Sequence, residues 1–350
     1  MKKSIVFALT LSMAITVAFA TGVQDTNGNA KNVTFNGELQ QGKYVIGLSN
    51  SYFGNTWRKQ MVEAFSNAAE EAKKAGYISN YQIQNGDGTV NAQIAQINSF
   101  ILAGVDAIAI CAASPTALNS TIQKALDKGI TVVAFDSIVN LDGVYTMDYP
   151  WEQIGAASTD YIAEQLNGKG NVVVVRGVSG AAPDKGIYAG IQKAIKKYPN
   201  LKIIQEVIGE ASATKTQEEL IKVLPSLPQV DAVITHCGGD AIGAVHAFEQ
   251  SGRKMPIIIG DNTAEFINWW EKQAGYKTLS QGSTPGCGGA AFWTALYVLN
   301  GFDVPKKMML GVPRVKIDNL NDYKGMKAGT FISPDFSKEY VLEDIINAAK

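Results

Sequence analysis

The sequence predicts an α/β protein with two similar doubly wound parallel-sheet lobes, joined by a hinge, and a ligand cleft between the lobes. From residue 44 onward, short apolar runs alternate with helical patterns, which is typical of a parallel sheet covered by helices on both faces. The second half of the chain also repeats the first. VDAIAI at 105–110 matches VDAVIT at 230–235, and ITVVAFDS at 130–137 matches PIIIGDN at 256–262.

The spacing of this repeat is constant, because the same interval separates Asp106 from Asp231 and Asp136 from Asp261. Each half therefore has the order strand, helix, strand, with an aspartate at the carboxyl end of the second strand. Ligands of open parallel sheets bind beyond the carboxyl ends of the strands. We therefore expect Asp136 and Asp261 on opposite lips of one cleft.

The N-terminus has the pattern of a cleavable export signal. Lys2 and Lys3 precede an apolar stretch at 5–17 and a small-x-small cleavage site, so residues 1–20 are predicted to be a signal peptide. The apolar stretch is too short to span a membrane. Residues 21–42 lack periodicity and large apolar side chains, which predicts a flexible leader.

Composition excludes several classes of protein. The formal charge of the 350-residue chain is −1 and no basic cluster occurs, which argues against nucleic acid as a partner. Three cysteines (111, 237 and 287) are too few for a disulfide scaffold, and no residues have metal-ligand spacing. We expect no metal and no cofactor.

The individual elements follow from the apolar periods. Strands are expected at 44–49, 81–84, 106–110, 131–135, 171–176, 202–208, 231–235, 256–260 and 278–282, with a short one at 314–318. Helices are expected at 56–75, 90–103, 116–128, 151–166, 186–198, 214–224, 240–251, 263–273, 287–300 and 337–348.

The domain boundaries are placed where this alternation is interrupted. Residues 137–150 contain turn residues and no helical pattern, so they are expected to cross between lobes, as are 262–263 and 283–285. The N-terminal lobe is predicted to hold residues 43–140 and about 285–312. The C-terminal lobe is predicted to hold 141–284 and part of the tail.

Polar and aromatic side chains gather directly after the first strand. Asn50, Phe53, Trp57 and Arg58 lie between an apolar run and a helical pattern, a position that suits a small polar ligand. The alternative is an ordinary strand–helix loop with the tryptophan in the core. The carboxyl ends of other strands carry Arg176 and Cys237. The arginine either reaches the cleft or pairs with Asp184 or Asp160, and the cysteine either touches the ligand or is a small buried thiol.

The two aspartates also have a structural alternative, because an aspartate after a strand can cap the next helix. No helix follows Asp136 directly, which favours a ligand role. Thr263 begins a helical pattern, so Asp261 is the more ambiguous of the two. Ser137 and Asn262 follow these aspartates and are further candidates, as is Ser283 before the last crossing.

Several segments together resemble a known family: GNTWR, AGVDAIAI, VVAFDS, CGGDAIGAVHAF and GDNTAEFINWW. In their order and spacing, over about residues 43–320, they are similar to the periplasmic sugar-binding proteins of ABC transporters, ribose-binding type. The resemblance implies a periplasmic receptor that captures a small, monosaccharide-like carbohydrate and delivers it to an ABC permease in the inner membrane. It also implies a monomer without enzymatic activity, and a chemoreceptor as a further candidate partner.

The resemblance assigns roles to individual positions. It implies a polar contact at Asn50, an aromatic ring that stacks on the sugar at Trp57 with Arg58 beside it, and polar contacts at Asp136, Cys237 or Gly238, Asp261 and Ser283. Three positions depart from the family pattern. Ser137 and Ile187 stand where the family often has arginine, and Ala211 stands where many members have an aromatic residue. The identity of the sugar does not follow.

The chemistry of these side chains is suited to binding rather than reaction. Carboxylates accept hydrogen bonds from hydroxyls, a guanidinium donates in a planar fork, and an indole covers a C–H face. No nucleophile has a positioned base. The alternative is a periplasmic carbohydrate-acting hydrolase that uses Asp136 and Asp261 as an acid pair.

Overall fold

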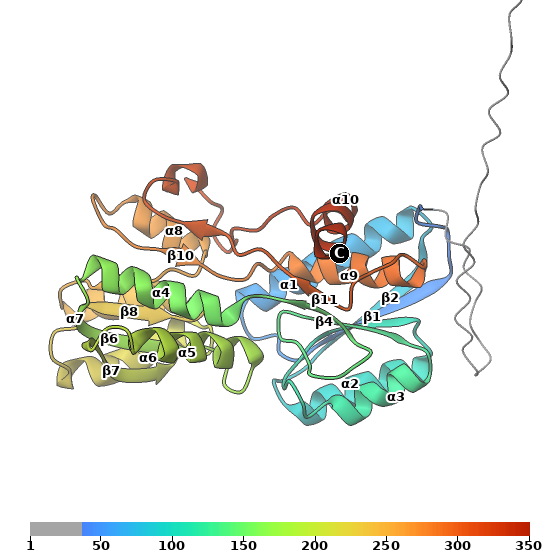
Figure 1. Cartoon of the computed structure of the whole chain (residues 1–350), viewed down its shortest axis with the longest axis horizontal. Coiled ribbons are helices and arrows are strands. Elements are labelled where there is room, and N and C mark those ends of the chain that lie inside the picture. The colour runs from blue at the N-terminus through green and yellow to red at the C-terminus, as the bar shows by residue number, and fades with distance from the viewer. Residues whose placement is uncertain (1–36) are drawn as a thin grey trace, which may run out of the picture. The chain divides into compact units, whose positions relative to one another are not determined.

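The computed structural model describes residues 37–350. The predicted signal peptide and residues 21–36 of the predicted leader lie outside the described residues. Within them, the predicted α/β fold with two parallel-sheet lobes is confirmed (Figure 1). No helix among residues 37–350 is both long enough and apolar enough to cross a membrane.

The first sheet has six parallel strands in the order β11-β5-β4-β3-β1-β2. Their bounds are β1 (Tyr44–Asn50), β2 (Ile78–Asn85), β3 (Ala107–Cys111), β4 (Thr131–Phe135), β5 (Tyr145–Asp148) and β11 (Lys307–Met309). Successive side chains alternate between the two faces of this sheet, and both faces are buried. Ile46 and Leu48 share one apolar cluster with α1 (Thr56–Lys74) and α9 (Cys287–Leu299), and Ile108 shares another with α2 (Val90–Ala103) and α3 (Asn119–Asp127).

The second sheet has four parallel strands in the order β7-β6-β8-β9. They are β6 (Lys169–Arg176), β7 (Asn200–Ile208), β8 (Ala232–Thr235) and β9 (Ile257–Ile258), and the antiparallel pair β10 (Ser280–Gln281) and β12 (Arg314–Val315) continues from β9 through a bridge between Gly260 and Ser280. The helices α4 (Trp151–Gln165) and α5 (Ala182–Ile195) share an apolar cluster with one face, and α6 (Ala213–Val223) and α7 (Asp240–Ser251) with the other.

Glycines allow α4 and α5 to approach closely. A Cβ atom at Gly155 would collide with the carbonyl oxygen of Ile187, and one at Gly190 would collide with that of Glu152. Ile187, one of the positions that depart from the pattern implied by the resemblance, is fully buried at this crossing. Its side chain therefore belongs to the core rather than to a binding site.

The structure differs from the expected elements in a few places. Strand β5 lies inside the segment 137–150, for which no element was expected, and its pairing with β4 and β11 keeps residues 145–148 in the first sheet. The chain then passes to the second sheet between Asp148 and Trp151. Residues 262–263 do not cross, because they connect β9 to α8 (Ala264–Glu271). In place of the helix expected at 337–348, the chain forms a short α10 (Lys338–Tyr340), followed by a π-helical turn at Val341–Ile346.

Candidate ligand-binding site

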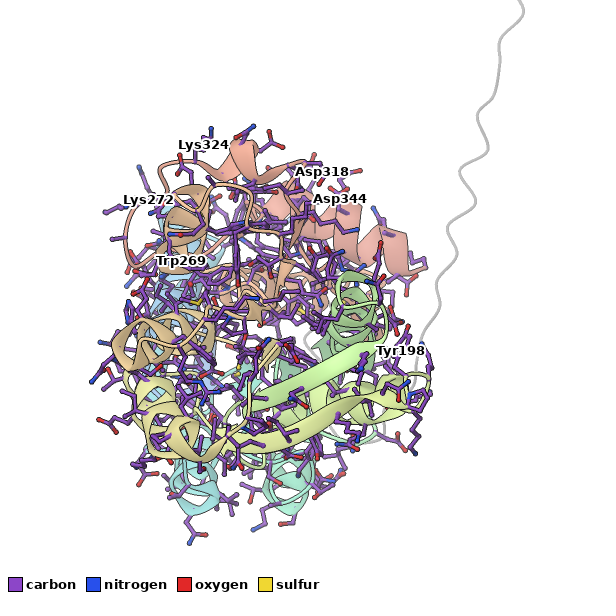
Figure 2. All side chains as sticks on the ribbon, turned by 90° about the vertical axis from the view of Figure 1, so that its left-hand side faces the viewer. Tyr198, Trp269, Lys272, Asp318, Lys324 and Asp344 are labelled. Carbon is purple, nitrogen blue, oxygen red and sulfur yellow. The ribbon has the colours of Figure 1, made fainter. Side chains whose placement is uncertain are left out.

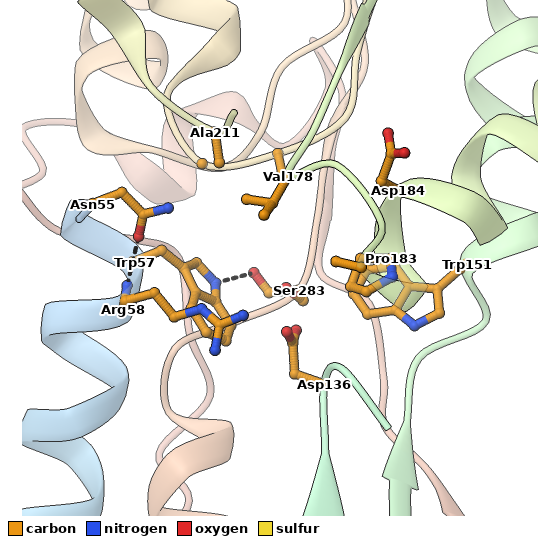
Figure 3. Close-up of a pocket in the computed structure, with 13 residues that line it drawn as sticks. Asn55, Trp57, Arg58, Asp136, Trp151, Val178, Pro183, Asp184, Ala211 and Ser283 are labelled. Atoms are coloured by element: carbon orange, nitrogen blue, oxygen red, sulfur yellow. Dashed lines mark hydrogen bonds between the residues drawn. The ribbon is translucent and has the colours of Figure 1, made fainter. Parts of the chain in front are cut away.

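A pocket with about 470 Å³ of empty space, partly open to solvent, lies where α1 begins and where several strands end (Figure 3). Its walls come from both sheets and their helices. The lining residues are Asn55, Trp57, Arg58, Asp136, Trp151, Val178, Ala181, Pro183, Asp184, Ala211, Cys237, Gly238 and Ser283. Five of the residues singled out from the sequence thus lie in one pocket: Trp57, Arg58, Asp136, Cys237 and Ser283.

The first turn of α1 is fixed by an N-cap. The Asn55 side chain accepts a hydrogen bond from the backbone N–H of Arg58 at 2.8 Å, as expected of asparagine at this position. The cap orients the next side chains, so that Trp57 and Arg58 both line the pocket. In Figure 3 the amide nitrogen of Asn55 lies on the pocket side.

Arg58 is buried, and the Asn50 and Cys111 side chains fix the position of its guanidinium. Its Nη1 donates to Asn50 Oδ1 at 3.0 Å and to Cys111 Sγ at 2.6 Å. The Asn50 amide donates in turn to Asn85 Oδ1 at 2.8 Å. Asn50 is fully buried and does not line the pocket, so its visible role is to position the guanidinium.

Asp136 follows β4 with a φ of +57°, a left-handed conformation that is uncommon for residues other than glycine. Only 4% of the residue is exposed, and its Oδ1 has no hydrogen-bond partner among residues 37–350. Burial raises the pKa of Asp136 to about 6, although the charge of Arg58 and the Ser283 side chain act in the opposite direction. A strained residue with an unsatisfied buried oxygen suggests a binding role.

Two indole rings flank this carboxylate in the view of Figure 3. Trp57 donates its Nε1 hydrogen to the carbonyl oxygen of Ser283 at 3.3 Å, and Trp151 donates its own to Asp148 Oδ1 at 2.8 Å. Because both polar atoms are already paired within the protein, each ring offers the pocket only its apolar surface. Such surfaces suit the C–H faces of a sugar ring.

The opposite wall is built from small and apolar side chains, among them Val178, Pro183 and Ala211. Ala211 has a φ of +57°, and a Cβ atom at Gly238 would lie 2.7 Å from the Ala211 Cβ. The loops after β7 and β8 are therefore in close contact. A larger side chain at position 238 would collide with Ala211, so a small residue is needed on this side of the pocket.

Arg176 pairs with Asp184, one of the alternatives left open by the sequence, and does not line the pocket. Its Nε and Nη2 lie 2.9 and 2.6 Å from the two carboxylate oxygens, and His236 Nδ1 lies 3.0 Å from Oδ1. Burial opposes ionisation, but His236 and Arg176 together lower the pKa of Asp184 to about 2. Burial also lowers the pKa of His236, which leaves Arg176 as the main charged partner at neutral pH.

Asp261 is a helix cap in this structure. Its Oδ2 accepts from the backbone N–H groups of Gly239 (2.7 Å) and Ala241 (3.1 Å), and its Oδ1 accepts from the Thr263 hydroxyl (2.8 Å). The carboxylate therefore ties the start of α7 to the start of α8. It does not line the pocket, so it is not available there as the second acid of a hydrolase pair.

Of the remaining candidates, Asn262, Ser137 and Phe53 do not line the pocket, whereas Cys237 does. Asn262 joins the Ser280 hydroxyl (2.8 Å) to the carbonyl oxygen of Pro313 (2.9 Å). Ser137 is fully buried, and Phe53 is 39% exposed; neither lines the pocket. Cys237 does line it, and burial raises the pKa of its thiol well above the usual range, so the thiol is neutral.

Sequence reasoning did not select Asn55, Trp151 or the wall from Val178 to Pro183. The asparagine directly precedes a helical pattern, which is a signal for a cap. Trp151 follows β5, a strand that the sequence did not predict, so the sequence did not indicate that this residue lies near a strand end. Trp269 and Trp270 on α8 do not line the pocket: Trp270 is fully buried, and Figure 2 shows Trp269 near Lys272. No group of three or more potential metal ligands occurs among residues 37–350.

Comparisons with known proteins show the family to which this chain belongs. The model of a family described as a periplasmic binding protein domain matches residues 46–302. The chain is 28% identical over 276 residues to the galactofuranose-binding protein YtfQ of Escherichia coli, covering 76% of this chain and 85% of that protein. It is 26% identical over 236 residues to the xylitol-binding protein of Mycolicibacterium smegmatis, covering 66% and 67%. A solved ABC transporter solute binding protein from Thermobispora bispora has a TM-score of 0.83 and 32% identity, covering 88% and 96%.

Proposed function

Since this chain belongs to the periplasmic binding protein domain family, we propose that it is a periplasmic receptor that captures a small, monosaccharide-like carbohydrate and delivers it to an ABC-type permease. Relatives named for binding xylitol, galactofuranose and ribose support a polyhydroxylated ligand. Export by a cleaved signal peptide and the ribose-binding type of receptor are parts of the same proposal.

One observation carries the proposal for the site: a buried carboxylate with an unpartnered oxygen lies among indole surfaces and one guanidinium. Asp136 would accept from sugar hydroxyls, and Arg58 would donate to them. Trp57 and Trp151 would cover the C–H faces of the ring. Asn55 and Ser283 add polar groups at the edge. A glycosidase needs a second free carboxylate beside Asp136. Asp261 does not line the pocket and the Asp184 carboxylate is paired with Arg176, which favours a receptor over a hydrolase.

Calorimetric titration of the purified protein tests this proposal. We would titrate pentoses, hexoses and pentitols and expect saturable binding with one ligand per chain. A bound ligand at about 100 times its Kd stabilises the folded state by about 2.7 kcal/mol, which a thermal shift should also detect. If no carbohydrate binds and none raises the melting temperature, the receptor function is wrong. Release of product from a chromogenic glycoside would instead support a hydrolase.

A further inference from the structure

The two sides of the pocket differ in polarity. Arg58 and Asp136 lie on the side of the first sheet, together with Asn55 at the start of α1. The side formed after β6, β7 and β8 consists mainly of small or apolar residues, together with Asp184. The former are Val178, Ala181, Pro183, Ala211, Cys237 and Gly238.

Asp184 does not offer its carboxylate to the pocket. Oδ1 accepts from Arg176 Nε at 2.9 Å and from the backbone N–H of Gly177 at 3.1 Å, and Oδ2 accepts from Arg176 Nη2. In Figure 3 the carboxylate points away from Asp136. This side chain therefore presents mainly its apolar part to the pocket.

Three backbone donors on this wall are engaged within the protein. Besides Gly177, the N–H of Ala181 donates to the carbonyl oxygen of Val178 at 3.2 Å, and that of Cys237 donates to Asp240 at 3.4 Å. Pro183 has no N–H. Apart from the neutral thiol of Cys237, no side chain of this wall has a free polar group.

We propose that the site selects a deoxy sugar, with its hydroxyl-bearing edge against Arg58 and Asp136 and a terminal methyl group against Val178, Pro183 and Ala211. This inference rests on the proposed receptor function. A hydroxyl against Val178, Pro183 and Ala211 would lose its hydrogen bonds to water and find no partner among these side chains, whereas a methyl group gains from burial. Such a site distinguishes two ligands by the unpaired polar group of the disfavoured one as well as by the contacts of the favoured one.

Matched sugar pairs test the inference. We would titrate the parent protein with D-fucose and D-galactose, L-rhamnose and L-mannose, and 5-deoxy-D-ribose and D-ribose. In each pair the members differ by one terminal hydroxyl. We expect the deoxy member of the pair that fits to bind about tenfold tighter or more, which corresponds to about 1.4 kcal/mol.

A pair of variants locates the preference. Val178→Thr replaces one methyl group on the wall by a hydroxyl at nearly constant shape, and it should reduce the deoxy preference about tenfold. Val223→Thr makes the same change on α6, away from the pocket, and should leave the preference unchanged. Ala211→Ser provides a second change on the wall, and the melting temperature of each empty variant checks its fold.

The outcomes separate the two proposals. If sugars bind but the hydroxylated member of each pair binds as tightly as its deoxy partner, the inference is wrong and the receptor function stands. If the deoxy preference exists but neither wall variant changes it, the assignment to this wall is wrong. If none of the sugars binds, both the inference and the receptor function fail.

Discussion

Replacing Asp136 by asparagine should stabilise the empty protein and weaken its binding of ligand. Only 4% of the residue is exposed, and one of its carboxylate oxygens has no partner among residues 37–350. Asparagine keeps the shape of the side chain but carries no charge. The substitution therefore removes the cost of holding a charge in the pocket, together with the benefit that this charge gives to a bound sugar.

The magnitude follows from the pKa. Burial raises the pKa of Asp136 from its ordinary value of 3.8 to about 6, in spite of Arg58 and Ser283. At about 1.4 kcal/mol for each pH unit, ionising Asp136 costs about 3 kcal/mol more in the fold than in the unfolded chain. Because the folded pKa is the higher one, the free energy of unfolding falls as pH rises from about 4 to about 6, and the loss is complete above that.

Calorimetry at two pH values measures this effect. At pH 8 the empty Asp136→Asn protein should gain up to about 3 kcal/mol of unfolding free energy, and at pH 4 the gain should nearly vanish. Its affinity for the sugar at pH 8 should fall about tenfold to hundredfold, because a hydrogen bond to a charged group contributes about 1.5–3 kcal/mol. Asp142→Asn, at an exposed position outside the pocket, is the control for the change of charge.

Two results would refute this reasoning. A lower melting temperature of the empty Asp136→Asn protein at pH 8 would mean that the carboxylate stabilises the fold. An undiminished affinity at pH 8 would remove Asp136 from the site.

Three other measurements test Arg58, the Arg176–Asp184 ion pair and closure of the pocket. Arg58→Lys keeps the charge but loses the planar guanidinium, whose Nη1 donates to both Asn50 and Cys111, so calorimetry should show an affinity at least about tenfold weaker. An equal affinity would mean that Arg58 does not contact the sugar. Arg176→Gln removes the charged partner of Asp184, and urea unfolding at pH 7 should show a loss of about 2 kcal/mol. Because the pKa of Asp184 is lowered to about 2, this loss should shrink as pH falls below about 4, and a loss independent of pH would contradict the assignment. Small-angle scattering should show a smaller radius of gyration with saturating sugar, since the pocket is lined from both sheets, and an unchanged radius with proven binding would exclude closure.

The sequence alone determined the fold class and the part of the pocket built on local signals. Strands buried on both faces must be apolar throughout, so β1, β3 and β4 could be read as short uninterrupted runs. The carboxyl ends of parallel strands meet at one edge of their sheet. Trp57, Arg58 and Asp136 were therefore expected near one another, and they line the same pocket.

Only the tertiary structure decided which polar side chains face the pocket and which are used inside the protein. Asp136 and Asp261 have equivalent places in the repeat, yet Asp261 caps helices and Asp136 keeps a free oxygen. The sequence left Asp160 and Asp184 as possible partners of Arg176, and the structure shows a bidentate pair with Asp184. A hydrogen-bonding group binds whichever partner the fold brings within about 3 Å, and residues distant in sequence compete for it. The periodicity of apolar residues reports burial, but it carries no information on that competition.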